Sequence, residues 1–225
     1  MLLKGLLVII RHEICATMRE GFAWLTPLLF FIIVVCLFPV GLNSDPSLLS
    51  TFAPGIIWII ALLAIIISID SLFQQDANEG FLDLLLLSSY PLTLLVFCKV
   101  VSHWITHCLP LVLVSPLLCN LLNLPQHEIM ILVLTLLLGT PVLSILGCIG
   151  AALLVGARSH SMLLPVLIMP FYIPVLIFGT GTIITSQAGQ PIGGYVAIMG
   201  ALLLLSIAFA PLLSGVALRI GVNKC

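Results

Sequence analysis

Three acidic side chains with helical spacing stand out in a chain of 225 residues that carries only eight acidic groups. Asp76, Glu79 and Asp83 are spaced i, i+3 and i+7, so a helix would place their carboxylates on one face. The opposite face would carry Phe81, Leu82, Leu85 and Leu86. The segment contains Gly80 and ends at Pro91, which cannot continue a helix. This pattern predicts a short amphipathic helix whose acidic face can dock a basic protein surface.

Two histidines could also do chemistry, because His103 and His107 are one helical turn apart. Imidazoles at this spacing can bind a metal or a haem iron. No third ligand is near them in sequence, so we favour an interfacial pair that hydrogen-bonds to headgroups or neighbouring helices, and we predict no metal site. Asp70 ends a long apolar run, where a carboxylate could couple transport to an ion gradient.

The motifs of catalysis and nucleotide binding are missing from the chain. No lysine stands in G-x-x-x-x-G-K-[ST], so the chain has no P-loop for ATP. His12 and Glu13 could begin the H-E-x-x-H zinc motif, but its second histidine is replaced by Ala16. Gly179 and Gly181 could begin the G-x-G-x-x-G fingerprint, but its last glycine is replaced by Ile184. The seven cysteines form no C-x-x-C pair. We therefore predict that the protein is not an enzyme and binds no cofactor of its own.

Composition sets the fold class. The chain is 62% hydrophobic and 7% charged, with a mean hydropathy of +1.36. A soluble fold of this size buries about 70–75% of its surface, too little to hide so many apolar side chains. No basic tract suggests a nucleic acid partner. The sequence predicts an all-α integral membrane protein in contact with lipid.

Six apolar runs are long enough to cross the hydrocarbon, which needs about 20 residues. We expect one membrane domain over 21–225, with spans near 22–42, 52–72, 103–122, 129–156, 163–184 and 194–218. All seven Lys and Arg residues fall before the first span, after the last one, or in the loops that follow spans two and four. The positive-inside rule therefore puts both termini in the cytoplasm and the acidic segment in the cytoplasmic loop between spans two and three.

Residues 1–20 have the pattern of a basic amphipathic helix that lies in the headgroup region. Arg11 cuts its apolar core short and no small-residue cleavage site follows, which argues against a signal peptide. The apolar run 92–122 is longer than one span needs. We place 92–102 at the cytoplasmic interface, where Lys99 can snorkel to headgroups.

Small residues and prolines predict how the spans pack. The helix-packing candidates in span four are Gly139, Pro141, Gly147, Gly150 and Ala151, of which Gly147 and Ala151 have small-xxx-small spacing. Span five contains Pro165, Pro170 and Pro174, so we expect it to be bent or broken. The small, polar stretch 179–192 after it is expected to fold partly back from the outer face.

Four stretches in order carry a family resemblance: EGFLDLLLLSSYPL, KVVSHWITHCLPLVLVSPLL, LLLGTPVLSILGCIGAAL and PFYIPVLIFG. Together they resemble the haem exporter protein B family, the membrane permease subunits of the cytochrome c maturation ABC transporter. The resemblance covers about 73–179. The family pattern in the first stretch is closer to DGTLEQLLLSPYPL, so Phe81, Leu84 and Ser89 depart from it, while Glu79, Gly80 and Asp83 keep its acidic face.

The resemblance implies an ABC-2 type exporter: an interfacial N-terminal helix, six spans, and a coupling helix carrying Asp76, Glu79, Gly80 and Asp83. It also implies two ATPase subunits, a second copy of this chain, small haem-handling membrane subunits and, indirectly, a periplasmic haem chaperone. Haem would be the cargo, and the location a bacterial inner membrane or the mitochondrial inner membrane. The candidate substrate-path or partner-facing residues are His103, Trp104, His107, Tyr172 and Pro174.

Three alternatives remain open at this stage. A permease of the same architecture could export a lipid, a drug or another small molecule, since nothing in the spans specifies haem. An ion-coupled carrier would depend on Asp70 and the histidines and need no ATPase. A scaffold that anchors an assembly complex would need no ATP-dependent step. The haem pathway itself leaves two roles, namely passage of haem through this subunit and a motion that serves release of the loaded chaperone.

Overall fold

A computed structural model describes residues 10, 11, 13–15, 17, 18, 23–41, 46–70, 92–154 and 160–222. All regular structure in these ranges is helical, which confirms the prediction of an all-α membrane protein. The elements are η1 (Ala23–Leu25), α2 (Thr26–Gly41), α3 (Pro46–Asp70), α6 (Leu92–His103), η2 (Trp104–Cys108), α7 (Leu109–Leu121), α8 (Gln126–Leu154), α9 (His160–Gln187) and α10 (Gly193–Val222). The predicted coupling residues 76–83 lie outside the described ranges.

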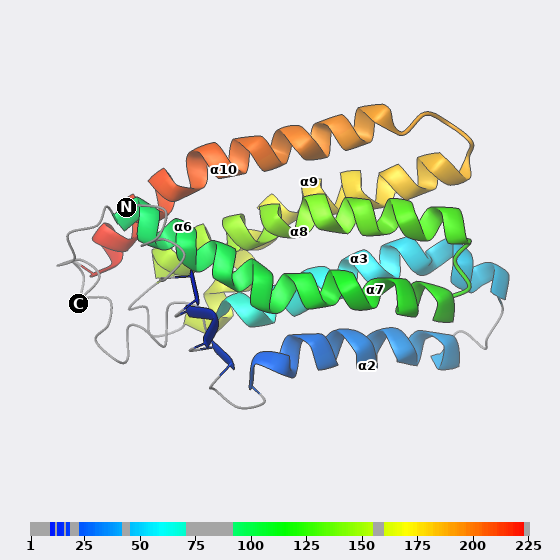
Figure 1. Cartoon of the computed structure of the whole chain (residues 1–225), viewed down its shortest axis with the longest axis horizontal. Coiled ribbons are helices and arrows are strands. Elements are labelled where there is room, and N and C mark those ends of the chain that lie inside the picture. The colour runs from blue at the N-terminus through cyan, green and yellow to red at the C-terminus, as the bar shows by residue number, and fades with distance from the viewer. Residues whose placement is uncertain are drawn as a thin grey trace.

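The helices lie side by side and reverse direction at each connection (Figure 1). Helix α6, the turn η2 and α7 follow one another without a break and make one pass. Helix α8 packs against α10, α9, α3 and α7, and α3 also packs against α2 and α9, so α3 and α8 form the centre. The described residues of 10–18 and the C-terminal end of α10 lie at the same end of the bundle as the start of α6.

Short connections produce the antiparallel neighbours. Helix α7 turns into α8 within a few residues, where Asn123 has the left-handed φ of 56° and Pro125 accepts the first backbone bonds of α8. Helix α9 turns into α10 through Gly189, whose φ of 68° suits a residue without a side chain. Because these connections are short, the joined helices pack against each other as antiparallel neighbours.

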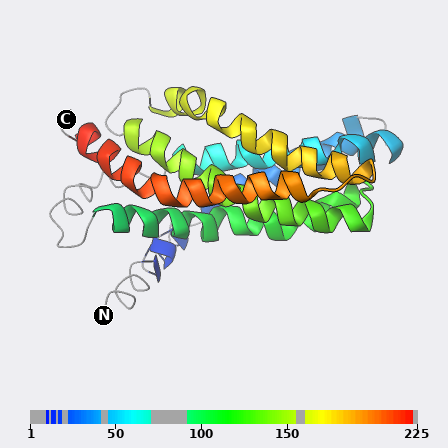
Figure 2. The same cartoon turned by 90° about the horizontal axis from the view of Figure 1, so that it is seen from above.

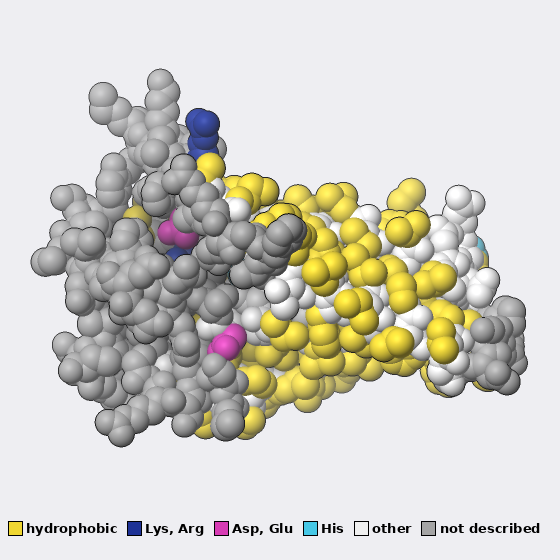
Figure 3. All heavy atoms as spheres, turned by 90° about the horizontal axis from the view of Figure 1, so that it is seen from below, with side chains coloured by type: hydrophobic (Ala, Val, Ile, Leu, Met, Phe, Trp, Pro, Cys, Tyr) yellow, Lys and Arg dark blue, Asp and Glu magenta, His cyan; other side chains and the backbone are white. Residues whose placement is uncertain are grey.

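On the face drawn in Figure 3, apolar side chains cover most of the described surface between its two ends. In the described part, four helical stretches are long and apolar enough to cross a membrane: Ser47–Asp70, Leu94–Leu121, Gln126–Leu154 and Leu163–Gln187. Thr26–Gly41 and Gly193–Phe209 are shorter apolar helices. The protein is therefore a multi-pass membrane protein, while six complete spans with cytoplasmic termini stay a prediction.

Helix α9 differs from the sequence-based expectation. It runs unbroken from His160 to Gln187 through Pro165, Pro170 and Pro174. Of the bend or break that the prolines predicted, the break is absent, and the bend stays a prediction. The partial return over 179–192 is also absent, because α9 continues to Gln187 and a short turn leads directly into α10. Each proline removes one backbone donor, but the flanking residues keep helical geometry when neighbouring helices hold them in place.

The central packing feature is Trp58 of α3, whose side chain is fully buried. Its indole lies against Gly139 of α8 and Gly179 of α9, and a methyl group added at either glycine would overlap the ring. Gly147 faces Ile69 and Tyr172 in the same way, and Gly150 faces Ile168. Ala151 is completely buried and Pro141 lies inside α8. The glycines of α8 and α9 are therefore places where large side chains of the facing helices fit against the backbone.

This packing predicts the effect of single methyl groups. Gly179→Ala and Gly139→Ala should each lower the free energy of unfolding by about 1–3 kcal/mol, because the added methyl overpacks against Trp58. Gly200→Ala is the matched control, since nothing lies within 4 Å of the position of its added methyl. That variant should be neutral or slightly more stable. Denaturant titration in detergent measures all three, and equal effects at Gly179 and Gly200 would contradict the packing account.

Candidate functional site around the π turn

The turn η2 is a π-helical segment that lies just before Pro110. Pro110 has no backbone N–H, and its ring would clash with the carbonyl four residues earlier, so the helix widens just before it. The N–H of Leu109 accordingly donates to the carbonyl of Trp104, five residues back. The hydroxyl of Thr106 donates to the carbonyl oxygens of Ser102 at 2.9 Å and His103 at 3.3 Å. A side chain thus supplies a donor where the backbone ladder is interrupted.

His103 lies at the start of this turn and is only 2% exposed. Its Nε2 is 2.9 Å from the hydroxyl of Ser68 on α3, and its Nδ1 is 2.8 Å from the hydroxyl of Ser144 on α8. Ser68 donates its own proton to the carbonyl of Ile65 at 2.8 Å, so Nε2–H of His103 is the donor to Ser68. In the neutral imidazole Nδ1 then accepts from Ser144. One ring therefore connects α3, α6 and α8.

His107 stacks on His103, with ring centroids 4.9 Å apart and an angle of 20° between the planes. Its Nδ1 is 2.9 Å from the hydroxyl of Thr106. Both nitrogens of His103 already have hydroxyl partners, and stacked rings do not direct two lone pairs at one ion. Within the described residues no group of three His, Cys, Asp or Glu side chains could hold a metal ion. The arrangement favours a role in packing and orientation over metal ligation.

Two further predicted residues join α8 to its neighbours near this turn. The indole N–H of Trp104 donates to the hydroxyl of Thr140 on α8 at 3.0 Å. The phenol of Tyr172 on α9 is fully buried and donates to the carbonyl of Leu143 at 2.7 Å. Pro174 lies on the exposed side of α9, away from this cluster. The structure thus brings together four of the five candidate path residues around α8 and leaves the fifth outside.

Lys99 lies one helical turn before His103 and corrects an expectation. Snorkelling to headgroups would leave its ammonium exposed, but Lys99 is only 7% exposed. Its Nζ is 3.4 Å from a carboxylate oxygen of Glu13, which belongs to the N-terminal segment. Ser102 donates to the carbonyl of Ile10 at 3.4 Å. An ion pair at low exposure satisfies the charge inside protein, so the N-terminal segment lies against α6.

A polar contact at the opposite end of the bundle was not predicted from the sequence. Glu128 is 4% exposed in the first turn of α8, and Gln187 at the end of α9 donates to its carboxylate at 2.7 Å. His127 lies 3.6 Å from the other carboxylate oxygen. The helix dipole favours an acid in the first helical turn, so the position of Glu128 was the feature of the sequence that could have indicated this contact. Asp70 is the last residue of α3 and is half-buried.

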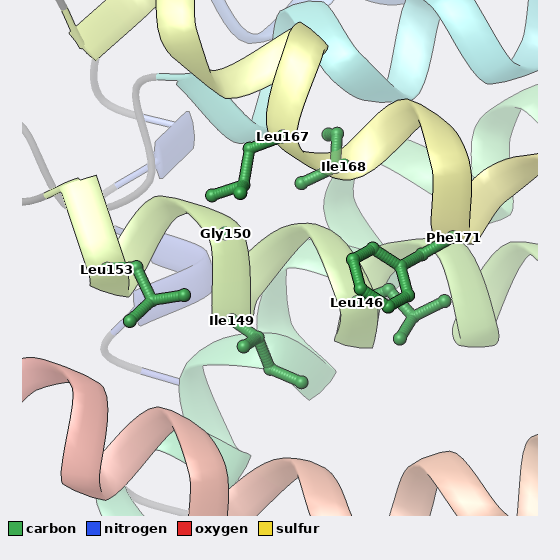
Figure 4. Close-up of a pocket in the computed structure, with 7 residues that line it drawn as sticks. All are labelled: Leu146, Ile149, Gly150, Leu153, Leu167, Ile168 and Phe171. Carbon is green, nitrogen blue, oxygen red and sulfur yellow. The ribbon is translucent and has the colours of Figure 1, made fainter.

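An apolar groove of about 250 Å³ lies between α8 and α9 (Figure 4). Its lining residues are Leu146, Ile149, Gly150, Leu153, Leu167, Ile168 and Phe171. Gly150 faces Ile168 across it, where the missing side chain lets the two helices approach. Walls of hydrocarbon side chains without a polar group can hold only an apolar chain or ring.

The His103 contacts predict a stability difference between two serines. Ser144→Ala should lower the free energy of unfolding by about 1–3 kcal/mol, because it leaves the buried Nδ1 of His103 without its donor. Ser206→Ala is the control, since that buried serine donates only to Leu202 of its own helix. Removing the Ser206 hydroxyl should lower the free energy of unfolding by less than the Ser144 change does. Unfolding of both variants in detergent tests this, and equal losses would mean that the His103 contact adds nothing.

Comparison with known proteins places the chain among relatives of nearly equal length. It is 44% identical over 218 residues to a Haemophilus influenzae protein named heme exporter protein B, covering 97% of this chain and 99% of the relative. The proteins of that name from Pseudomonas aeruginosa and Escherichia coli are 44% and 41% identical, over 88% and 96% of this chain and 89% and 98% of theirs. The family model described as CcmB protein matches residues 4–221. The chain therefore belongs to the CcmB protein family.

Proposed function

We propose that this chain is the permease subunit of an ABC transporter complex that exports or delivers haem to a periplasmic haem chaperone for c-type cytochrome biogenesis. The observation that carries the proposal is the match to proteins named heme exporter protein B, at 41–44% identity over almost the whole chain. The relatives are bacterial, which supports a bacterial inner membrane as the location. Haem enters this account as cargo, and ATP would be hydrolysed by a separate subunit.

The described helices support a subunit that receives motion from outside its own spans. Helix α3 ends at Asp70 and α6 begins at Leu92, so the acidic segment is the link between them. A displacement of that link acts on the ends of both helices. His103 joins α6 to Ser68 of α3 and Ser144 of α8, so the same displacement would also reach α8. The acidic face would dock the ATPase, with two ATPase copies and a second copy of this chain in the assembly.

The first test asks whether the protein acts in cytochrome c maturation. In a strain without this chain, denaturing gels stained for haem should lose covalently bound haem, while b-type cytochromes remain at normal levels. The two classes of cytochrome should differ because only c-type cytochromes need haem delivered for covalent attachment. Plasmid-borne wild-type chain should restore the signal. Normal c-type cytochromes in the deletion strain would refute the proposal and leave an exporter of another cargo.

A second test addresses docking of the ATPase. Changing Asp76, Glu79 and Asp83 together to lysine should abolish copurification of the ATPase, because the docking face then repels a basic partner surface. The amount of chain in the membrane should stay unchanged. Lys99→Arg, which keeps its charge and lies inside the bundle, is the control and should retain the ATPase. Unchanged recovery of the ATPase with the triple variant would contradict docking through this face.

A further inference from the structure

One ring nitrogen of His107 has no partner, in contrast to the two nitrogens of His103. The Nδ1 of His107 lies 2.9 Å from the hydroxyl of Thr106. That hydroxyl already donates its proton to the carbonyl oxygens of Ser102 and His103. The Nδ1–H of His107 is therefore the donor to Thr106, and in the neutral ring the Nε2 carries a lone pair. Among the described residues, none forms a hydrogen bond with this Nε2.

The Nε2 of His107 can be reached from outside the chain. The indole nitrogen of Trp58 is the only buried side-chain nitrogen without a partner among the described residues, and His107 itself is partly exposed. The pass that contains His107, formed by α6, η2 and α7, lies in front in Figure 1 and along one edge of the bundle in Figure 2. An unpaired acceptor that is not enclosed by its own chain can receive a group that comes from elsewhere.

The depth of His107 limits what that group can be. His107 lies at the middle of the candidate span Leu94–Leu121, where lipid tails offer no hydrogen-bond donor. An ionisable side chain at this depth indicates a functional site, and membrane transporters bind their cargo near the middle of the bilayer. The partly exposed neighbours of His107 along the pass are apolar, namely Ile105, Leu109 and Pro110. A flat, largely apolar molecule with one site for a nitrogen ligand fits these surroundings.

Two contacts hold the His107 ring in a fixed orientation. Thr106 binds its Nδ1, and the ring of His103 stacks against its face with centroids 4.9 Å apart. His103 is itself held between Ser68 of α3 and Ser144 of α8. In metal-binding histidines one nitrogen donates to a fixed oxygen while the other presents its lone pair to the metal. His107 has this arrangement.

Two stacked imidazoles cannot share one metal ion, but a haem iron needs only one imidazole on each of its faces. We propose that the Nε2 of His107 binds the iron of haem as one axial ligand while haem crosses the membrane as cargo. The bond forms from the lone pair of Nε2 to the iron, and no proton is released. The other face of the haem stays open for a ligand of the next carrier.

This assignment rests on the haem export proposed above, but the two can fail separately, because haem binding needs neither transport nor an ATPase. If the deletion strain loses its c-type cytochromes while no haem spectrum depends on His107, the export function stands and the site is wrong. If the strain keeps its c-type cytochromes while the spectrum depends on His107, the site stands and serves another pathway.

Haem titration of the chain in lipid nanodiscs tests the ligand. Haem is added to the wild-type chain, and its absorption spectrum is followed before and after reduction of the iron. A spectrum of nitrogen-ligated haem should form, and His107→Ala should not give it. Free imidazole should restore it in His107→Ala, because the base can bind the iron in place of the missing side chain. His127→Ala, which removes an exposed histidine at the opposite end of the bundle, should bind haem like the wild type.

Thr106 gives a second variant that keeps the ligand itself. Thr106→Val removes the oxygen that fixes Nδ1 of His107 and should weaken haem binding about tenfold. Thr106→Ser keeps the hydroxyl and should retain the wild-type affinity. Equal affinities of the valine and serine variants would contradict the positioning role of Thr106.

Two results of the titration would overturn the proposal. An unchanged spectrum with His107→Ala would place the haem elsewhere, and Nε2 would then be an acceptor for a donor of another subunit. A spectrum that is lost with His107→Ala and not restored by imidazole would mean that the change acts through the fold of the bundle.

Discussion

Hydrogen-bond donors are scarce inside a bilayer, and this scarcity shapes most of the polar contacts in the bundle. Hydrocarbon offers no partner, so a buried polar group that is not paired inside the protein costs free energy. Ser115, Thr135 and Thr182 donate to carbonyls of their own helices. His103 and Trp104 reach across to α8 instead. The contacts of His103 and Trp104 lie at the turn before Pro110, whereas Gln187 of α9 and Glu128 of α8 pair at the opposite end of the bundle.

The place of these contacts matters for how motion could pass through the protein. Lys99 holds the N-terminal segment through Glu13, and one turn later His103 holds α3 and α8. The two contacts share one helix, α6, which begins where the acidic link ends. These contacts fix α6 at two neighbouring turns to the N-terminal segment, α3 and α8. A displacement of α6 would therefore change its contacts with all three.

The sequence predicted best what local physics determines. Long apolar runs must be helical in lipid, because only a helix pairs its backbone within one segment, so the positions of α3, α8 and α9 followed from composition. The place of the π turn could not be predicted, because Pro116, Pro141, Pro170 and Pro174 also sit inside apolar runs and their helices continue without such a turn. The partners of His103 could not be predicted either, because Ser68 and Ser144 lie 35 and 41 residues away in sequence. Lys99 was misjudged for the same reason: its partner Glu13 is 86 residues distant.

The two sides of α9 differ in their contacts, because one side bonds to neighbouring helices and the other is exposed. Its inner side is fixed from Tyr172 to Gln187: Tyr172 bonds to α8, Gly179 receives Trp58, and Gln187 bonds to Glu128. Trp58 keeps an unpaired indole N–H in this packing, a cost of about 1–3 kcal/mol that a large buried aromatic surface can offset. A helix held this firmly on one side keeps its shape without help from the other. Its outer side can therefore carry Pro170 and Pro174 while the helix keeps its geometry from His160 to Gln187.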